Sequence, residues 1–208
     1  MVGRFAAVAW IAAATVWGAS AWGAAKQAPA GPGPVEQAAE NEIAAVRDTI
    51  VDALWVKTDE YWHAQENLAA VIEICRMEIE LDPHFSDAYS VGAWLSLQHG
   101  QDKQALDFYK QGVAANPDDY ELLHEFGLRY YMLAKHDPKG ALPYLKRAAE
   151  LPSPAPIKHT YAHALAQAGQ RKAAAAEWLK ILKQFPNDPI ARREVKKLQA
   201  AGKAGPGK

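Results

Sequence analysis

The sequence has 208 residues, one cysteine and a net charge of −1 at pH 7. A charge this close to zero argues against a nucleic acid or an acidic membrane surface as an obligatory partner. A single cysteine excludes an internal disulfide and any zinc site built on several cysteines. Alanine is frequent and β-branched residues are sparse, so the composition favours helices.

The first 25 residues have the pattern of a targeting segment. Arg4 precedes an uncharged, mostly apolar run from Phe5 to Ala25, and small residues near its end suit a signal peptidase. The same run is long enough to span a bilayer as an uncleaved anchor. Residues 1–25 are therefore predicted to be either a signal peptide or an N-terminal membrane anchor. Both alternatives place the rest of the chain outside the cytoplasm, in the periplasm or extracellular space or tethered to the membrane.

A short linker and a helix follow this segment. Residues 26–34 are rich in Pro, Gly and Ala and predict a linker. Ile43, Val46 and Ile50 then recur at helical spacing. No Pro or Gly separates this stretch from the one that begins at residue 52, so nothing in the sequence prevents the two from forming one long helix.

From residue 52 onward the sequence repeats with a period of 34 residues. Pro83 and Pro117 are 34 residues apart, and so are the small residues Ala93 and Gly127. Each unit consists of a predicted helix, a short turn, a second helix and a turn that contains proline. The predicted units cover about residues 52–85, 86–119, 120–154 and 155–188.

This pattern resembles the tetratricopeptide repeat, whose units are 34-residue helical hairpins. The second unit fits best, with Tyr89, Ala105, Tyr109 and Pro117 at the signature positions. The resemblance implies an all-α fold, a right-handed superhelical solenoid of helix-turn-helix units. With helical caps at both ends, the solenoid is expected to cover residues 35–199. Residues 200–208 are predicted to be a disordered tail.

The stretch that joins the first two units offers two interpretations. Asp82, His84 and Asp87 are residue types that bind metals or act as bases, yet proline turns recur at this place in later units while His84 does not. We therefore interpret the stretch as a turn between helices. Pro83 is expected to end one helix, and Ser86 or Asp87 to cap the next.

The third unit departs from the pattern by two additional residues between its helices, in the stretch KHDPKG. Asp137 is the expected N-cap of the second helix, with Pro138 at its first position. Pro143 falls early in that helix and is expected to bend it. Cys75 occupies a packing position of the first unit and is expected to be a buried, unreactive thiol.

The resemblance also implies a concave groove, lined by the first helix of each unit, that binds a peptide or a partner helix. The alternative is that the large aromatic residues Trp94 and Tyr131 pack between units. The residues predicted to line the groove are Glu60, His63, Asp87, Trp94, Gln98, Glu121, His124, Tyr131, His159 and His163.

A metal site is a further hypothesis. His159 and His163 are four residues apart, which places both on one face of a helix, and His124 and Glu121 belong to the preceding first helix. Lys158 next to the pair disfavours a cation. No HExxH motif, nucleophile elbow or phosphate loop is present, so we expect no enzymatic activity and no cofactor.

These observations together predict an interaction protein. The expected function is that of a scaffold or assembly factor of the cell envelope, with a protein or peptide as partner and no role for nucleic acid. The alternatives are a structural subunit of a membrane-tethered complex, held through residues 5–25, and a histidine-rich metal-binding protein.

Overall fold

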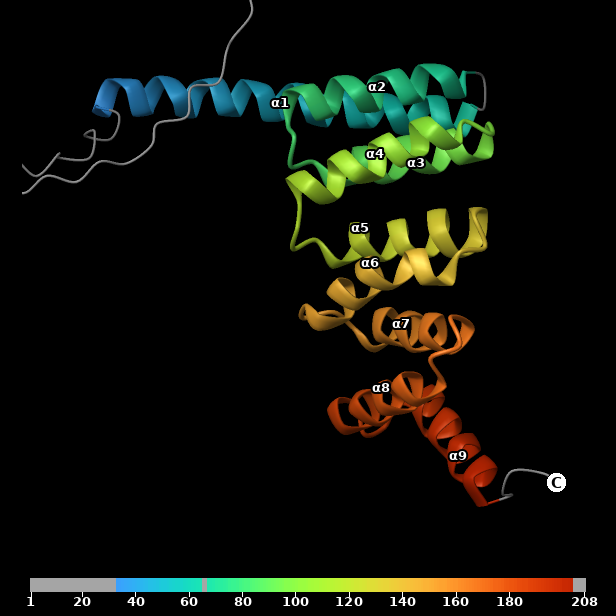
Figure 1. The fold of residues 1–208 in the computed structure, drawn as a ribbon. Coiled ribbons are helices and arrows are strands. Elements are labelled where there is room, and N and C mark those ends of the chain that lie inside the picture. The colour runs from blue at the N-terminus through green and yellow to red at the C-terminus, as the bar shows by residue number, and fades with distance from the viewer. Residues whose placement is uncertain (1–32, 65–66, 204–208) are drawn as a thin grey trace, which may run out of the picture. The chain divides into compact units, whose positions relative to one another are not determined.

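The computed structural model describes residues 33–64 and 67–203. Every element in this part is a helix, which confirms the predicted all-α class (Figure 1). In chain order the elements are α1 (Pro34–Ala64), α2 (Leu68–Leu81), α3 (Ser86–Gln98), α4 (Asp102–Ala115), α5 (Tyr120–Glu125), the π-helix η1 (Phe126–Ala134), α6 (Pro138–Glu150), α7 (Ala155–Gln167), α8 (Arg171–Gln184) and α9 (Pro189–Lys203). The chain forms two compact units, Met1–Glu40 and Asn41–Lys208. The packing described below lies within the second.

The helices of the second unit form a stack of hairpins. Each helix from α2 to α9 contacts the next one along the chain. In addition α3 contacts α5, and α5 contacts α7, so the first helices of successive hairpins lie next to one another. Stacking of this kind buries apolar faces that no hairpin could cover alone. The arrangement is the predicted solenoid of helix-turn-helix units.

The stretch before residue 52 and the first helix of the first unit form a single helix, α1. Its packing begins at Val51, which is buried, and continues through Thr58, which donates a hydrogen bond to Glu78 Oε1 of α2 at 3.3 Å. Almost all residues of α1 before Val51 are exposed. The helix therefore has a packed C-terminal half and an exposed N-terminal part.

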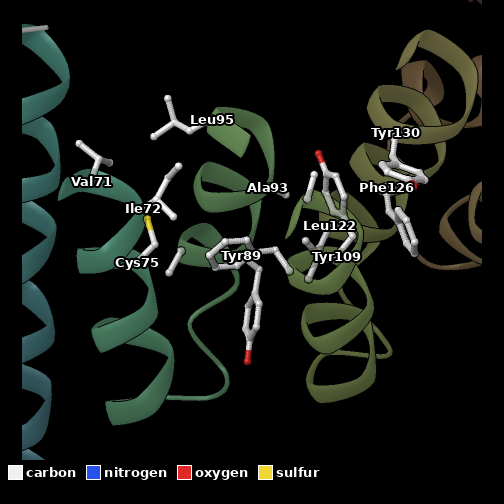
Figure 2. Close-up of a cluster of buried hydrophobic side chains, with 13 residues drawn as sticks. Val71, Ile72, Cys75, Tyr89, Ala93, Leu95, Tyr109, Leu122, Phe126 and Tyr130 are labelled. Carbon is white, nitrogen blue, oxygen red and sulfur yellow. The ribbon is translucent and has the colours of Figure 1, made fainter. Parts of the chain in front are cut away.

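Aromatic rings and small residues fill the core that Figure 2 shows. The rings of Tyr109 and Phe126 stack with their centroids 5.0 Å apart. A Cβ atom on Gly112 would lie 2.8 Å from Tyr89 Cγ and 2.9 Å from Leu122 Cδ2, so the close approach of these helices requires glycine. The recurring small residues of the sequence are therefore contact points between helices.

Local hydrogen bonds shape the turn between α2 and α3. Asp82 is the C-cap of α2, and its Oδ1 atom accepts a hydrogen bond from the backbone N–H of His84 at 2.9 Å. The expected cap at Ser86 or Asp87 is wrong, because the N-cap of α3 is Phe85 and no side chain caps the helix. Ser86 is instead the first residue of α3, where its own backbone is already helical.

The third unit contains the irregular element of the solenoid. Its first helix begins as α5 and continues as η1, a π-helix of nine residues. Asp137 then caps α6 by accepting a hydrogen bond from Gly140 N–H at 2.9 Å, and Pro138 follows it at the start of the helix, as predicted. Pro143 lies inside α6.

The predicted targeting segment of residues 1–25 and the linker up to residue 32 lie outside the described residues. Among the described helices, none is both long enough and apolar enough to cross a membrane. At the other end, α9 continues to Lys203, which is inside the segment predicted as a disordered tail.

Candidate functional site

The first helices of three successive units line an open pocket that is rich in tryptophan. Its volume is about 420 Å³, and its lining comes from α1, α3, α5 and η1. We call it the tryptophan pocket; it is lined by Trp55, Trp62, Asp87, Ser90, Val91, Trp94, Glu125 and Arg129. An adjoining hollow of about 180 Å³ shares some of this lining and adds Thr58, Asp59 and His63.

The three tryptophans are held in place by ring contacts. Trp55 and Trp62 are seven residues apart on α1, which places them on one helix face two turns apart. Trp62 stacks on Trp94 of α3, with ring centroids 4.7 Å apart and an angle of 14° between the planes. Trp55 meets the ring of Phe85 edge-on at 5.3 Å. All three are half-buried, so part of each ring is fixed by packing and part remains accessible.

Charged side chains form the other side of the tryptophan pocket. Arg129 Nε donates a hydrogen bond to Glu125 Oε1 at 3.2 Å. Asp87 is partly open to solvent, yet burial raises the pKa of its carboxyl, and the negative charges of Asp119 and Glu125 raise it further. Two carboxylates and one guanidinium line the pocket, so its net charge at neutral pH is negative.

Comparison with known families identifies the repeat. A family model described as tetratricopeptide repeat matches residues 132–201, and the stacked helical hairpins described above extend the same architecture toward the N-terminus. This chain contains tetratricopeptide repeats and has their solenoid fold. A comparison of its sequence with curated proteins gave no match.

Solved structures of other tetratricopeptide repeat proteins have a similar fold. YrrB, a tetratricopeptide repeat protein with an unusual peptide-binding site, is 22% identical with a TM-score of 0.52, and the match covers 70% of this chain and 74% of that one. PilF of Pseudomonas aeruginosa is 20% identical with a TM-score of 0.57, covering 76% and 71%. PilW, a type IV pilus biogenesis factor, is 19% identical with a TM-score of 0.53, covering 73% and 70%. At these identities the likeness is one of fold.

The predicted groove residues of this tetratricopeptide repeat protein do not all meet in one place. Asp87 and Trp94 line the tryptophan pocket, and His63 lines the adjoining hollow. Glu60 is exposed on α1 and pairs with Lys57. Gln98 is exposed at the C-terminal end of α3. The pocket therefore joins only part of the predicted set.

Six lining residues were not among the predicted groove positions: Trp55, Trp62, Ser90, Val91, Glu125 and Arg129. Two of them, Trp55 and Trp62, belong to α1. Their spacing of seven residues was the signal that could have identified them, because it places two tryptophans on the same face of a helix.

Tyr131 packs within the third unit. Its ring stacks on Tyr144 of α6 at 5.4 Å and an angle of 17°, and it also contacts Phe126 at 5.2 Å. A Cβ atom on Gly140 would lie 2.6 Å from the ring of Tyr131. These contacts lie within one unit rather than between units, and they account for the half-buried state of Tyr131.

The histidines of the C-terminal half pack separately. His124 Nε2 lies 3.0 Å from Thr160 Oγ1, and burial lowers the pKa of this imidazole. His159 is 7% exposed, with its Nε2 atom 3.1 Å from Asp188 Oδ1 outside hydrogen-bond geometry. His163 is exposed, and it meets the ring of Trp178 edge-on at 5.0 Å. His159 also contacts that ring, at 5.3 Å.

These positions give the metal hypothesis no support. Glu121 is exposed at the start of α5, and its backbone N–H donates to Asp119. In the described part of the chain, no three side chains of His, Cys, Asp or Glu are placed to hold a metal ion. Lys158 is buried, and its Nζ atom donates to the carbonyls of Ala149 and Leu151 at the end of α6. That lysine caps a helix C-terminus, where a positive charge is favourable.

Cys75 is buried, as predicted. Burial, together with the neighbouring charge of Glu78, raises the pKa of its thiol to about 12. The thiolate is the reactive form of cysteine, so this side chain is unreactive in the folded protein at neutral pH.

Proposed function

We propose that this tetratricopeptide repeat protein is an interaction scaffold that binds a peptide segment of a protein partner in the tryptophan pocket. The observation that carries the proposal is the stack of Trp62 on Trp94 beside Trp55, three half-buried rings fixed by contacts within the chain. Aromatic anchors in packed pockets supply most of the binding energy at protein interfaces. Because the rings are fixed before binding, little side-chain entropy is lost when a partner arrives.

The lining favours a particular kind of peptide. An apolar side chain placed against the tryptophan rings would gain about 1.5–3 kcal/mol from burial. A neighbouring Lys or Arg would face Asp87 and Glu125, and a cation above a tryptophan ring gains about 0.5–2 kcal/mol more. We therefore propose an extended segment in which an aromatic or long aliphatic residue stands next to a basic one.

We further propose that the protein acts in the cell envelope. The apolar run at residues 5–25 supports export or tethering. The fold is also similar to that of PilW, which is described as a pilus biogenesis factor. Fractionation of cells that produce the full chain, followed by N-terminal sequencing of the mature protein, tests this proposal. Recovery from the cytoplasm with residues 1–25 intact would contradict it.

Selection of short random peptides against the immobilised full chain tests the pocket. We expect enrichment of sequences with an apolar residue beside Lys or Arg. In the Trp94→Ala variant, binding of the enriched peptide should weaken about 30-fold, equal to about 2 kcal/mol. Leu179→Ala is the control, because Leu179 is an exposed apolar residue on α8 that does not line the pocket.

A charge reversal tests the expected chemistry. In Asp87→Lys, the selection should lose its preference for basic residues while the apolar preference stays. Binding of the wild-type peptide should also weaken as salt is added. If Trp94→Ala and Leu179→Ala bind the enriched peptide with the same affinity as the wild type, the tryptophan pocket is not the binding site.

A further inference from the structure

The part of α1 that precedes Val51 carries an apolar stripe that no described residue covers. Ile43, Val46 and Ile50 are 69%, 60% and 43% exposed. Their spacings of three and four residues place them on one helix face. At 3.6 residues per turn, that face lies about a quarter turn from the face of Val51 and Thr58, which is buried. The stripe is therefore not a continuation of the packed face of α1.

The stripe has the spacing of a coiled-coil seam. Ile43 and Ile50 stand at two successive a positions of a heptad, and Val46 and Ala53 stand at the d positions between and after them. Lys57 occupies the next a position and ends the seam. β-branched residues such as isoleucine are typical of the a positions of parallel two-stranded coiled coils, although leucine is usual at d, where this stripe has Val46 and Ala53.

Charged residues flank the stripe in a complementary pattern. In this register Glu42 is at position g and Arg47 at position e of the following heptad. In a parallel pair of helices, a residue at position g of one chain faces the residue at position e of the following heptad in the other chain. Two identical chains would therefore form two symmetric Glu42–Arg47 pairs. In the single chain, Arg47 contacts the adjacent Asp48 at 3.0 Å, and both side chains are exposed. An antiparallel pair would lose the match between g and e.

We propose that a second copy of this chain covers the stripe, with the two α1 helices in a parallel, in-register coiled coil. The proposal is independent of the tryptophan pocket, which belongs to another face. An isolated helix with this little packing is marginally stable in water, and burial of the stripe would stabilise it. The seam is short, so the dimer should be weak and its population should rise with concentration.

Cysteine crosslinking of the full chain in cells tests the pairing. The native Cys75 is buried and does not interfere. Ile43→Cys and Val46→Cys should each give several-fold more oxidised dimer than Asp48→Cys, because Asp48 stands at position f on the opposite face of the same segment. Equal yields for all three variants would overturn the proposal. A crosslinked product whose mass differs from two chains would identify another partner and overturn it as well.

The orientation is tested by mixing two differently tagged chains. In a parallel pair, Ile43→Cys should crosslink to itself more than to Ile50→Cys, whereas an antiparallel pair reverses this order and contradicts the proposed register. In the Ile43→Cys background, Glu42→Lys and Arg47→Glu should each reduce the yield, and the double variant should restore it. Failure of the double variant to restore crosslinking would remove the charge argument. The urea midpoint of each variant monitors its fold.

Discussion

Two neighbouring hairpins of this solenoid fill matching positions with different chemistry. In the α3–α4 hairpin, Gly92 and Gly112 let the helices approach so closely that a Cβ atom on either would lie under 3.0 Å from a neighbouring side chain. Thirty-four residues earlier, in the α1–α2 hairpin, Thr58 and Glu78 occupy these positions and are joined by a hydrogen bond of 3.3 Å. One hairpin is thus closed by van der Waals contact, and the other by a polar pair.

The polar pair makes the first hairpin sensitive to pH. Glu78 is fully buried, and its Oε2 atom has no hydrogen-bond partner among the described residues. Burial raises the pKa of Glu78 to about 7, although the hydrogen bond from Thr58 opposes the shift. A buried carboxyl that must ionise weakens the folded state, whereas glycine contacts do not titrate. The comparison shows that one backbone geometry can be stabilised in two ways with different dependence on conditions.

The largest expected effect comes from breaking the glycine contact. Gly112→Ala places a methyl group against Leu122 Cδ2 and against Cβ and Cγ of Tyr89, two atoms close to the backbone that cannot move away easily. We expect a loss of about 3 kcal/mol in the free energy of unfolding, the upper end of the usual cost of overpacking. Urea unfolding followed by circular dichroism measures it. Gln111→Ala, at an exposed neighbouring position, is the control; an unchanged midpoint for Gly112→Ala would show that the helices can separate at no cost.

The second effect is the titration of Glu78. Its folded pKa lies above the unfolded value, so its contribution to stability is fully present below the unfolded pKa and is lost as pH rises through about 7. Between pH 5 and pH 8 this loss should be roughly 2 kcal/mol. In Glu78→Gln the loss should disappear, which urea unfolding at several pH values would detect. Glu80→Gln, at an exposed position of the same helix, should follow the wild-type pH profile; a Glu78→Gln profile parallel to it would contradict the prediction.

The smallest expected effect concerns the N-caps of the second helices, which differ between the two hairpins. Asn67 caps α2 by accepting a hydrogen bond from Ala70 N–H at 3.1 Å, whereas Gln101, 34 residues later, makes no such bond to α4. Asn67→Ala should cost about 1 kcal/mol. Gln101→Ala should stay within about 0.5 kcal/mol of the wild type. Thermal melting of both variants measures the difference, and equal melting temperatures would show that the cap at Asn67 adds no stability.

The fold was predictable because its signal recurs. Proline turns and small residues return at one period, and matching pairs such as Pro83 with Pro117 and Ala93 with Gly127 support one another. The lining of the tryptophan pocket was predictable only in part, because a single unit does not show which side chains of a neighbouring unit it meets. Trp62 of α1 contacts Trp94 of α3, and no pattern in the sequence indicates that these two side chains meet.

Individual residues that depart from the repeat pattern were harder to interpret than the repeat itself. Glu78 occupies a position that is small in the next unit, and the sequence alone does not reveal whether its carboxyl turns outward or is buried. His159 was expected to line the groove, yet it is buried next to Asp188, which belongs to the following turn. Both outcomes depend on partners from another helix or turn, and local periodicity carries no information about them.

The π-helix η1 has a consequence for how this chain accommodates changes in length. The first helix of the third unit, α5 with η1, has six and nine residues, whereas α3 has thirteen. A π turn holds about one residue more than an α turn for the same advance along the axis. The two additional residues, predicted to lie between the helices of this unit, are instead absorbed inside its first helix, and Asp137 still starts α6 beside it. The longer third unit still presents both of its helices to the next one, because α7 contacts α5 as well as α6.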